Sequence, residues 1–484
     1  MTNLDAAAAN AGDPAVVAAL TEKDGISPVF VPRTKNFRRY NFWITMSTIA
    51  FASITTAVVG ITLPNHLQML EFGSWFTGAN ASVDLQKLTD LKMAIDAGTA
   101  TATPEQAHQL ELLSGFEAAR ATSLGIVVGL ATILTMLAQP IIGFLSDRTR
   151  SRLGRRAPWI LYGALAGALL LAALRFAPSV AMVAIIWMLA QTAIAAAQGP
   201  LGATLADRVP EDRLGSVSAW MGLGGFLGGA VGGISAGLLF SMIGLNIYIV
   251  VAVVIALVSF VFVLVYRDSS SRDMKVSRVT FGEFLRGFLI PLKSADFRWV
   301  WIARVLLFFG YGVSTALSLY MLQSYIRPAM TAADATRLAP LLASIGIPFT
   351  LVIVVFAGKL SDKFGRRKPF VFASSALMAV SFAFPLVWPT LPAMIVQGIL
   401  AALAFGMYLP VDGALFVDVL PDRGKSAGRD LGIAAIATSL GNALGPMVAA
   451  GVLSITGRYE FVWVLSIVLV GVAAVAILRV KGVR

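Results

Sequence analysis

The sequence lacks cysteine, has only two histidines and is poor in charged residues. Without cysteine, disulfides and thiolate metal sites are excluded, and two histidines cannot make a histidine-rich metal centre. The sequence also has no nucleophile motif and no phosphate-binding loop, so we predict that the protein is not an enzyme and holds no metal. Charged residues make up 13% of the chain, about half the share usual in soluble domains, and the mean hydropathy is +0.79. A surface that faces water on all sides cannot be built from this composition.

The sequence is rich instead in apolar stretches close to the ~20 residues that a helix needs to cross a bilayer. These stretches recur along the whole chain and predict an all-α polytopic membrane protein with twelve transmembrane helices. The predicted spans are 41–66, 121–145, 157–178, 180–207, 215–243, 245–266, 299–325, 340–360, 368–389, 392–418, 430–456 and 459–480. Residues 1–40 are polar and alanine-rich without the apolar core of a signal peptide, and we expect a cytoplasmic tail there.

The net charge of +12 is spread unevenly along the chain. The basic residues lie in alternate connections between the apolar stretches, where the positive-inside rule places cytoplasmic loops. We therefore predict a plasma (inner) membrane protein with both termini in the cytoplasm, a central cytoplasmic loop at 267–298 and an extracellular segment at 70–120. This distribution argues against a nucleic-acid partner. Within the extracellular segment we expect short amphipathic helices at 83–118, either as ordinary loop packing or as a lid.

Two patterns occur twice in the sequence. The charged loop GFLSDRTRSRLGRRAPW at 143–159 has a near copy, GKLSDKFGRRKPF, at 358–370. The stretch LGSVSAWMGLGGFLGG at 214–229 aligns with LGIAAIATSLGNALGP at 431–446. The chain is therefore predicted to be two copies of one six-helix unit, a bundle at 41–266 and a bundle at 299–484. Duplicated halves around a cavity in the middle of the membrane are typical of secondary transporters.

The sequence has two six-helix halves, a basic central loop, and the pattern G-x-x-S-D-[RK]…G-R-R-x-P after the second and eighth spans. With these features it resembles the major facilitator superfamily over residues 38–480. The resemblance implies a monomeric secondary transporter that works by alternating access on a small-molecule substrate within the lipid bilayer. It implies no cofactor, with a proton gradient as the energy source.

In that superfamily the charged loop closes the cytoplasmic side of the outward-facing state. The aspartates that end spans four and ten lie at the same depth as the loops, so they are natural partners for the loop arginines. The resemblance thus assigns six gating residues: Asp147, Arg156, Asp207, Asp362, Arg367 and Asp418. The alternative is that the arginines merely follow the positive-inside rule.

The first copy of the loop has four extra residues, Thr149–Arg152. This longer loop resembles that of the sucrose carriers, close to the glycoside–pentoside–hexuronide carriers, and QGPLGATLAD at 198–207 is similar to Q-G-P-x-R-A-x-x-A-D in plant sucrose carriers. The resemblance implies a sugar or glycoside as substrate. Gly202 departs from the pattern, because the sucrose carriers have arginine there. Gln139 and Asn442 stand where melibiose-type carriers have their sodium-binding aspartates and a lysine, so we do not expect sodium coupling of that kind.

Charged residues inside a membrane span are costly and usually functional. Asp412 precedes Asp418 by six residues and lies about 9 Å deeper along a helix, and Arg304 lies at a similar depth in the seventh span. Spans seven and ten line the cavity in this superfamily. We hypothesise that Arg304 and Asp412 face each other, with Asp412 as the proton-coupling carboxylate and Arg304 as its counter-ion. The alternatives are a fixed structural ion pair, or an Arg304 that reaches the lipid headgroups.

Sugar sites combine aromatic faces with amide and hydroxyl groups. Polar residues on predicted cavity helices supply such groups and are our candidates for substrate binding: Asn65, Gln191, Gln198, Tyr311, Gln323, Gln397, Tyr408 and Asn442. Each of them can instead bond to a neighbouring helix. We interpret His66, at the outer end of the first span, as a surface residue.

The fifth span contains a set of glycines that resembles a motif of drug exporters, except that Gly229 replaces the proline of the motif: Gly215, Gly224, Gly228, Gly232 and Gly233. Close helix packing explains the same spacing. Two functions therefore stay open, a proton-coupled symporter that imports a sugar or glycoside and a proton antiporter that exports an amphipathic compound. A polar, amide-rich cavity favours the first, and an apolar, aromatic cavity favours the second.

Overall fold

The computed structural model describes residues 34–266, 270–272, 294–419 and 427–481, without the side chains of 34–36, 211–212, 362 and 427–432. Within these residues the chain forms helices and no strand. The N-terminal half contains α3 (Thr34–Ile54), the π-helix η1 (Thr55–Thr62), α4 (Leu63–Trp75), η2 (Gly78–Asn80), α5 (Leu85–Asp96), α6 (Pro104–Arg148), α7 (Ala157–Leu174), α8 (Val180–Arg208), α9 (Glu211–Ile243), η3 (Gly244–Asn246) and α10 (Ile247–Val265). The C-terminal half contains α12 (Ala295–Ala316), α13 (Ser318–Ser324), α14 (Ala332–Ile345), α15 (Ile347–Phe364), α16 (Lys368–Val387), α17 (Leu391–Asp418), α18 (Ala427–Thr456) and α19 (Glu460–Ile477).

Eleven helical stretches of the described chain are long and apolar enough to cross a membrane. One of them, Arg213–Val265, contains two helices, α9 and α10. The chain changes direction between them at Gly244, whose φ of 51° is a conformation that glycine adopts without steric cost. Counting α9 and α10 separately gives the twelve spans that the sequence predicts.

The second span begins earlier than predicted. Helix α6 starts at Pro104 rather than near 121, because Thr103 and Gln106 form a capping box that begins the helix there. The first turns of α6 are held by a small apolar core in which Leu113 and Phe116 pack with Phe76 and Leu88. The prediction of short amphipathic helices at 83–118 is therefore confirmed for α5 and wrong for 104–118, which belongs to the 45-residue helix α6.

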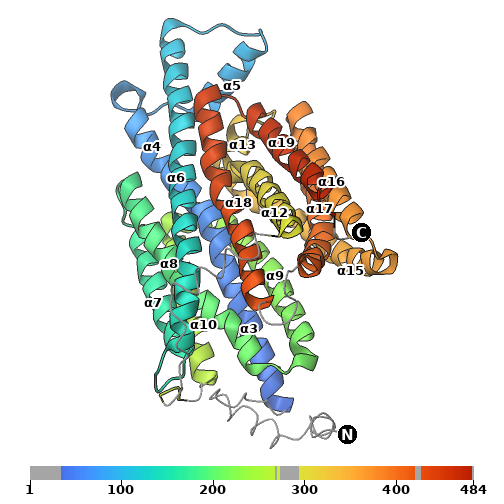
Figure 1. Cartoon of the computed structure of the whole chain (residues 1–484). Helices are drawn as coiled ribbons and strands as arrows, with labels where there is room; N and C mark the ends of the chain where they lie inside the picture. The colour runs from blue at the N-terminus through green and yellow to red at the C-terminus, as the bar shows by residue number, and fades with distance from the viewer. Residues whose placement is uncertain (1–33, 267–269, 273–293, 420–426, 482–484) are drawn as a thin grey trace, which may run out of the picture.

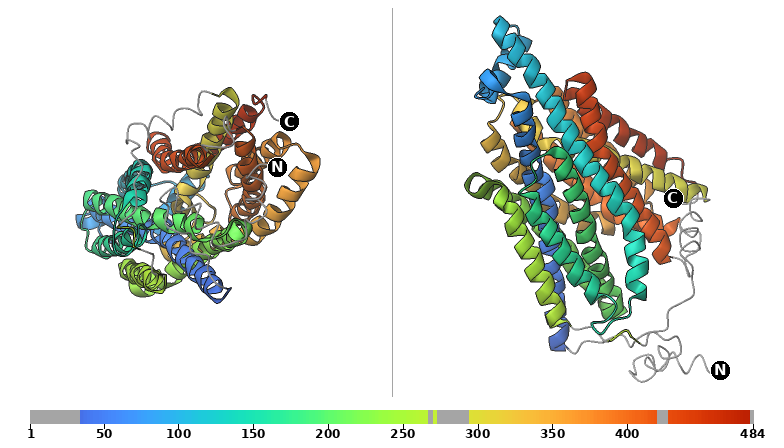
Figure 2. Two further views of the ribbon diagram at one scale, coloured as in Figure 1. Left: turned by 60° about the horizontal axis from the view of Figure 1, so that its bottom comes forward. Right: turned by 90° about the vertical axis from the view of Figure 1, so that its left-hand side faces the viewer.

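The helix contacts repeat between the two halves. In the N-terminal half α7 packs on α8, α3 on α9, α6 on α8 and α10 on α7. The equivalent pairs of the C-terminal half are also in contact, namely α16 with α17, α12 with α18, α15 with α17 and α19 with α16. Figure 2 shows the halves side by side, the first in blue to green and the second in yellow to red.

The two halves meet along α6 with α18 (Figure 1), and also along α9 with α14. In Figure 1 helix α5 and the first turns of α6 lie at the top of the molecule, and the connection between α6 and α7 lies at the bottom. We call these the α5 end and the arginine-loop end. The sequence predicts that the α5 end faces outward and that the arginine-loop end faces the cytoplasm.

Candidate functional site

A cavity of about 430 Å³ lies between the two halves. This volume falls within the roughly 300–1,000 Å³ that small-molecule sites occupy. Its N-terminal wall comes from η1 and α9, and its C-terminal wall from α12, α13, α14, α15, α17 and α19. The first span runs without interruption from α3 through the π-helix η1 into α4, whereas α14 and α15 are separated at Gly346, which lines the cavity.

The cavity presents hydroxyl, amide and aromatic groups. The hydroxyls belong to Thr56, Tyr311, Ser314, Thr315, Ser318, Ser344 and Thr350. Gln397 contributes an amide, and Phe226, Phe405 and Trp463 contribute rings. Among the described residues that line the cavity, no side chain is charged. The site therefore suits an uncharged ligand with hydrogen-bonding groups and an apolar face.

The predicted pairing of Arg304 with Asp412 is present in the structure. Arg304 Nη1 lies 3.1 Å from Asp412 Oδ2, and Arg304 Nε donates a hydrogen bond to Thr438 Oγ1 at 3.0 Å. The Asp412 side chain is 2% exposed and that of Arg304 is 18% exposed. The guanidinium also lies 4.9 Å from the ring centre of Phe416. Three helices, α12, α17 and α18, thus hold one nearly buried ion pair.

A set of rings connects this ion pair with the cavity. Tyr311 and Phe405 line the cavity with ring centres 5.3 Å apart, and Phe308 contacts Phe405 edge-on at 5.6 Å. Phe308 also contacts Tyr408 at 6.3 Å, and Tyr408 lies one helical turn before Asp412 on α17. The hydroxyl of Tyr408 and Oδ1 of Asp412 are both buried and have no hydrogen-bond partner in the described chain other than each other. A donor and an acceptor are therefore available to each other beside the ion pair.

Arginines at the arginine-loop end pair with the predicted aspartates. Arg156 contacts Asp147 Oδ1 through Nη2 at 2.6 Å and Asp207 Oδ2 through Nε at 3.0 Å. Arg155 reaches the other oxygen of Asp207 at 2.5 Å. Because Asp147 lies on α6 and Asp207 on α8, these contacts join two helices of the same half.

The C-terminal half has an equivalent pair, Arg367 with Asp418, whose closest atoms are 2.7 Å apart. The side chain of Asp362 lies outside the described residues. The pairing of five of the six predicted gating residues is therefore present, and their role in gating stays a prediction.

The four extra residues of the first loop contact the central segment 270–272. The backbone N–H of Ser151 donates to Ser271 Oγ at 3.0 Å, and Ser271 Oγ donates to the carbonyl of Thr149 at 2.9 Å. The N–H of Ser271 donates to the carbonyl of Ser151 at 3.1 Å. Trp159 Nε1 also donates to Thr149 Oγ1 at 2.7 Å. The insertion therefore connects the loop with the segment that follows the sixth span.

The structure brings only part of the predicted substrate site together. Tyr311 and Gln397 line the cavity, and Tyr408 lies beside the ion pair. The remaining candidates are not among the lining residues: Asn65, Gln191, Gln198, Gln323 and Asn442. Two of these make bonds across the halves at the α5 end.

Asn65 and Gln323 have structural partners that explain their absence from the cavity. Asn65 donates to the carbonyl of Ile61 at 2.8 Å and accepts from Thr336 Oγ1 at 3.1 Å. Gln323 accepts a hydrogen bond from Arg120. The alternative that such residues bond to neighbouring helices therefore holds for both of them.

Arg120 is the residue that the sequence analysis missed. It is 2% exposed, and its Nη1 donates to Gln68 Oε1 at 3.1 Å and to Gln323 Oε1 at 2.8 Å. Its Nη2 donates to Ser324 Oγ at 2.7 Å, so Arg120 bonds to both halves. The signal was the pair Glu117 and Arg120, spaced to share one face of a helix, in a stretch that we expected to be a surface segment.

His66 is buried rather than on the surface. Its side chain is 2% exposed, because Tyr248 of α10 covers it. The two ring centres are 5.8 Å apart, and the Tyr248 hydroxyl lies 3.4 Å from His66 Nδ1. Our interpretation of His66 as a surface residue is therefore wrong.

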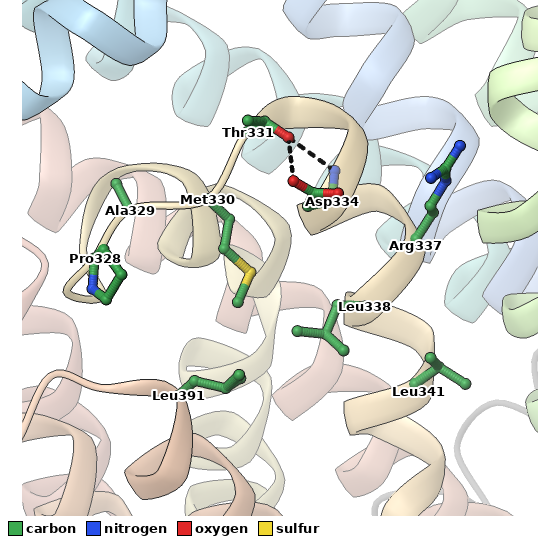
Figure 3. A pocket seen from close by; sticks show the side chains of 9 residues that line it. All are labelled: Pro328, Ala329, Met330, Thr331, Asp334, Arg337, Leu338, Leu341 and Leu391. Carbon is green, nitrogen blue, oxygen red and sulfur yellow. Dashed lines mark hydrogen bonds between the residues drawn. The ribbon is translucent and has the colours of Figure 1, made fainter.

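A second pocket, of about 490 Å³, opens near the start of α14 and α17 (Figure 3). Thr331 and Asp334 exchange hydrogen bonds at the first turn of α14, with Thr331 Oγ1 donating to Asp334 Oδ2 at 2.7 Å. Leu338 and Leu341 of α14 and Leu391 of α17 make its apolar side. None of the predicted site residues lines this pocket, so the cavity between the halves is the stronger candidate.

Residues 115–478 match a family model described as MFS/sugar transport protein, in which MFS denotes the major facilitator superfamily. The chain belongs to this family. Its members are transporters rather than enzymes, and the chain is accordingly a secondary transporter in a membrane. Comparison with curated proteins gives no match.

Solved structures of transporters share the fold of this family member. A bacterial homologue of the human lysosomal transporter Spinster, in an inward-facing and unoccupied conformation, aligns with a TM-score of 0.62 at 14% identity, over 93% of this chain and 98% of that chain. A variant of the nucleoside transporter NupG aligns with a TM-score of 0.61 at 14% identity, over 91% of this chain and 99% of that chain. At this identity the likeness shows the fold alone.

Proposed function

We propose that this transporter imports a sugar or glycoside together with protons, by alternating access. The observation that carries the proposal is a pair of neighbouring sites. An uncharged cavity with hydroxyl and amide groups lies between the halves, and the buried pair of Arg304 and Asp412 lies close to it. Phe405 of the cavity and Asp412 are seven residues apart on α17, which is about 10 Å along a helix.

The chemistry of the cavity supports an uncharged, hydroxyl-bearing substrate. Most of its hydroxyls already donate to helix carbonyls, as Ser314 does to Tyr311 at 2.8 Å and Thr350 to Ala402 at 3.1 Å. Their remaining lone pairs accept hydrogen bonds, and the amide of Gln397 supplies both donors and an acceptor. The rings of Tyr311 and Phe405 offer a flat apolar face for a sugar ring. The description of the family as sugar transporters supports the same substrate class.

The ion pair supplies a means of proton coupling. A charged carboxylate holds Arg304 in place, whereas a protonated Asp412 no longer neutralises it. Arg304 cannot give up its own proton, so protonation of Asp412 changes the net charge of the pair by one. Thr438 and Phe416 contact the guanidinium independently of Asp412 and would hold it when the carboxylate is neutral.

Uptake into proteoliposomes tests the coupling. The protein is reconstituted with an acidic outside and a more basic inside, and the accumulation of labelled mono- and disaccharides is measured. We expect Asp412→Asn to abolish accumulation above equilibrium while exchange of substrate across the membrane persists. Asp96→Asn, at the exposed end of α5 and outside the proposed machinery, is the matched control, and we expect it to keep pH-driven accumulation. Retained pH-driven accumulation by Asp412→Asn would rule out Asp412 as the coupling group.

We propose that the structure represents a state open toward the arginine-loop end. The hydrogen bonds named above between α4 or α6 and the C-terminal half all lie at the α5 end, such as those from Arg120 to Gln323 and Ser324. The ion pairs named at the arginine-loop end join helices of one half. In the other state of the cycle, the six predicted gating residues would close that end.

The same proposal places the transporter in the sucrose-carrier branch. It also includes a monomeric state and a plasma (inner) membrane location with both termini in the cytoplasm. The longer loop at Thr149–Arg152 supports the branch, and the alternation of basic connections supports the orientation.

Export of an amphipathic compound is the second candidate, and the rings of Phe226, Phe405 and Trp463 in the cavity favour it. A thermal-shift screen of the purified protein against saccharides and lipophilic cations separates the two. We expect stabilisation by at least one saccharide. Stabilisation by lipophilic cations alone would favour export.

A further inference from the structure

Helix α9 carries two adjacent rows of glycine that meet different surroundings. The first row, Gly224, Gly228 and Gly232, lies against α3. A Cβ atom on Gly228 would lie 2.4 Å from the carbonyl oxygen of Ile49, and one on Gly232 would lie 2.2 Å from that of Ser53. These glycines are required by helix packing, which confirms the packing interpretation for this row.

The second row faces the cavity and has no such requirement. Gly225 and Gly229 both line the cavity, as does Gly60 of η1. A Cβ on Gly225 or Gly60 would meet no atom within 4 Å, and one on Gly229 would make only an ordinary contact with Thr56, at 3.6 Å. Neither α9 position has a positive φ, so the backbone does not require glycine either. These positions have room for a side chain, and that room is part of the cavity.

The C-terminal wall provides an independent indication of a ligand in the same cavity. Trp463 lines it, is 1% exposed, and its indole N–H is buried without a hydrogen-bond partner in the described chain. A buried donor without an acceptor is costly, and a ligand oxygen would satisfy it.

We infer that Gly60, Gly225 and Gly229 form a substrate-facing glycine wall that sets the largest substrate the transporter accepts. The wall leaves bare backbone where side chains would otherwise fill the space, so a second ring of a disaccharide or the aglycone of a glycoside fits against it. The inference rests on the proposed function only in its choice of saccharides as ligands. The size limit itself follows from the wall.

A graded series of side chains at Gly225 tests the inference. Gly225→Ala and Gly225→Leu are reconstituted, and kcat/KM is measured for saccharides of one, two and three rings. We expect Gly225→Leu to lower kcat/KM at least tenfold for the largest substrate of the native protein and less than threefold for the smallest, with Gly225→Ala between. Gly215→Leu is the matched control, because Gly215 lies on the same helix, meets no atom within 4 Å and is not among the lining residues.

Several outcomes would overturn the glycine wall. Equal losses at every size, or no loss in a folded Gly225→Leu variant, would show that the wall does not limit size. Should Gly225→Leu fail to fold, Gly225→Ala and Gly60→Ala carry the test with the same size series. Should the native protein bind no saccharide, the proposed function fails, and a size series of the lipophilic compounds that do bind tests the wall in its place.

Discussion

Arg304 remains charged in every state of the transporter, because a guanidinium does not lose its proton in a protein. Its partner Asp412 is the group that can change charge, and Thr438 and Phe416 contact the arginine from α18 and α17. An arrangement of this kind keeps the cation in place while the carboxylate changes its protonation. A coupling role requires contacts that hold the guanidinium when the carboxylate is neutral, and Thr438 and Phe416 supply them.

Removal of Arg304 provides a prediction with a definite pH dependence. Arg304→Gln leaves Asp412 buried without a counter-ion, which costs about 3–5 kcal/mol of stability where the carboxylate stays ionised. At low pH the carboxylate takes up a proton, so we expect the loss to be smallest in acid and to grow as the pH rises. Melting temperatures of the purified protein across a range of pH measure this.

The double variant Arg304→Gln with Asp412→Asn is the control for that series. It has no buried charge, and we expect its melting temperature to be close to that of the native protein at all pH values. A loss for Arg304→Gln that does not vary with pH would contradict the prediction.

At the scale of elements, helix α9 packs against α3 with one face and lines the cavity with the neighbouring face. The prediction concerns Gly228, where the α3 backbone fills the space beside the Cα atom. Gly228→Ala places a Cβ 2.4 Å from the Ile49 carbonyl oxygen, so α3 and α9 must move apart. We expect a loss of about 1–3 kcal/mol in stability, typical of overpacking. Thermal melting measures it, with Gly225→Ala as the neighbouring variant that should melt like the native protein.

The sequence predicts which segments are helical better than it predicts where each helix begins and which of its faces meets the cavity. Twelve spans are readable because a crossing helix needs a long apolar stretch, and a charged residue such as Asp412 stands out within one. The start of α6 is not readable from hydropathy, because 104–120 is polar and continues a helix beyond the apolar stretch. A capping signal at Thr103 was the available indication.

The binding candidates illustrate a second limit. A membrane helix is apolar on most of its circumference, so the sequence fixes its length without fixing its rotation. Gln397 faces the cavity, whereas Asn65 and Gln323 face structural partners at the α5 end. The pair of Arg304 and Asp412 was predictable because a buried charge requires an opposite charge at the same depth.

At the scale of the whole molecule, the α5 end is closed by a buried polar cluster centred on Arg120. Helix α5 takes part, because Lys92 contacts Glu117 at 2.8 Å and Glu117 lies one turn from Arg120. The guanidinium also lies 4.5 Å from the ring centre of Tyr320, on α13 of the other half. Opening of this end requires the bonds from Arg120 to the C-terminal half to break.

The last prediction concerns this closure. Arg120→Gln removes the charge-assisted bonds to Gln323 and Ser324, each worth about 1.5–3 kcal/mol, and 1.4 kcal/mol corresponds to a tenfold change in an equilibrium. We therefore expect the population open at the α5 end to rise at least tenfold. Because the native sequence has no cysteine, Ser318→Cys in the cavity provides a single reactive thiol for labelling from that side with a membrane-impermeant maleimide.

Lys92→Gln is the matched control for this measurement. Its side chain contacts Glu117 within the N-terminal half, so its loss removes charge from the cluster without breaking a bond between the halves. We expect labelling at Ser318→Cys to stay near the native rate with Lys92→Gln and to rise with Arg120→Gln. Equal labelling rates in the two variants would mean that the closure of the α5 end does not depend on Arg120, and that the packing of α6 on α18 and of α9 on α14 holds it shut instead.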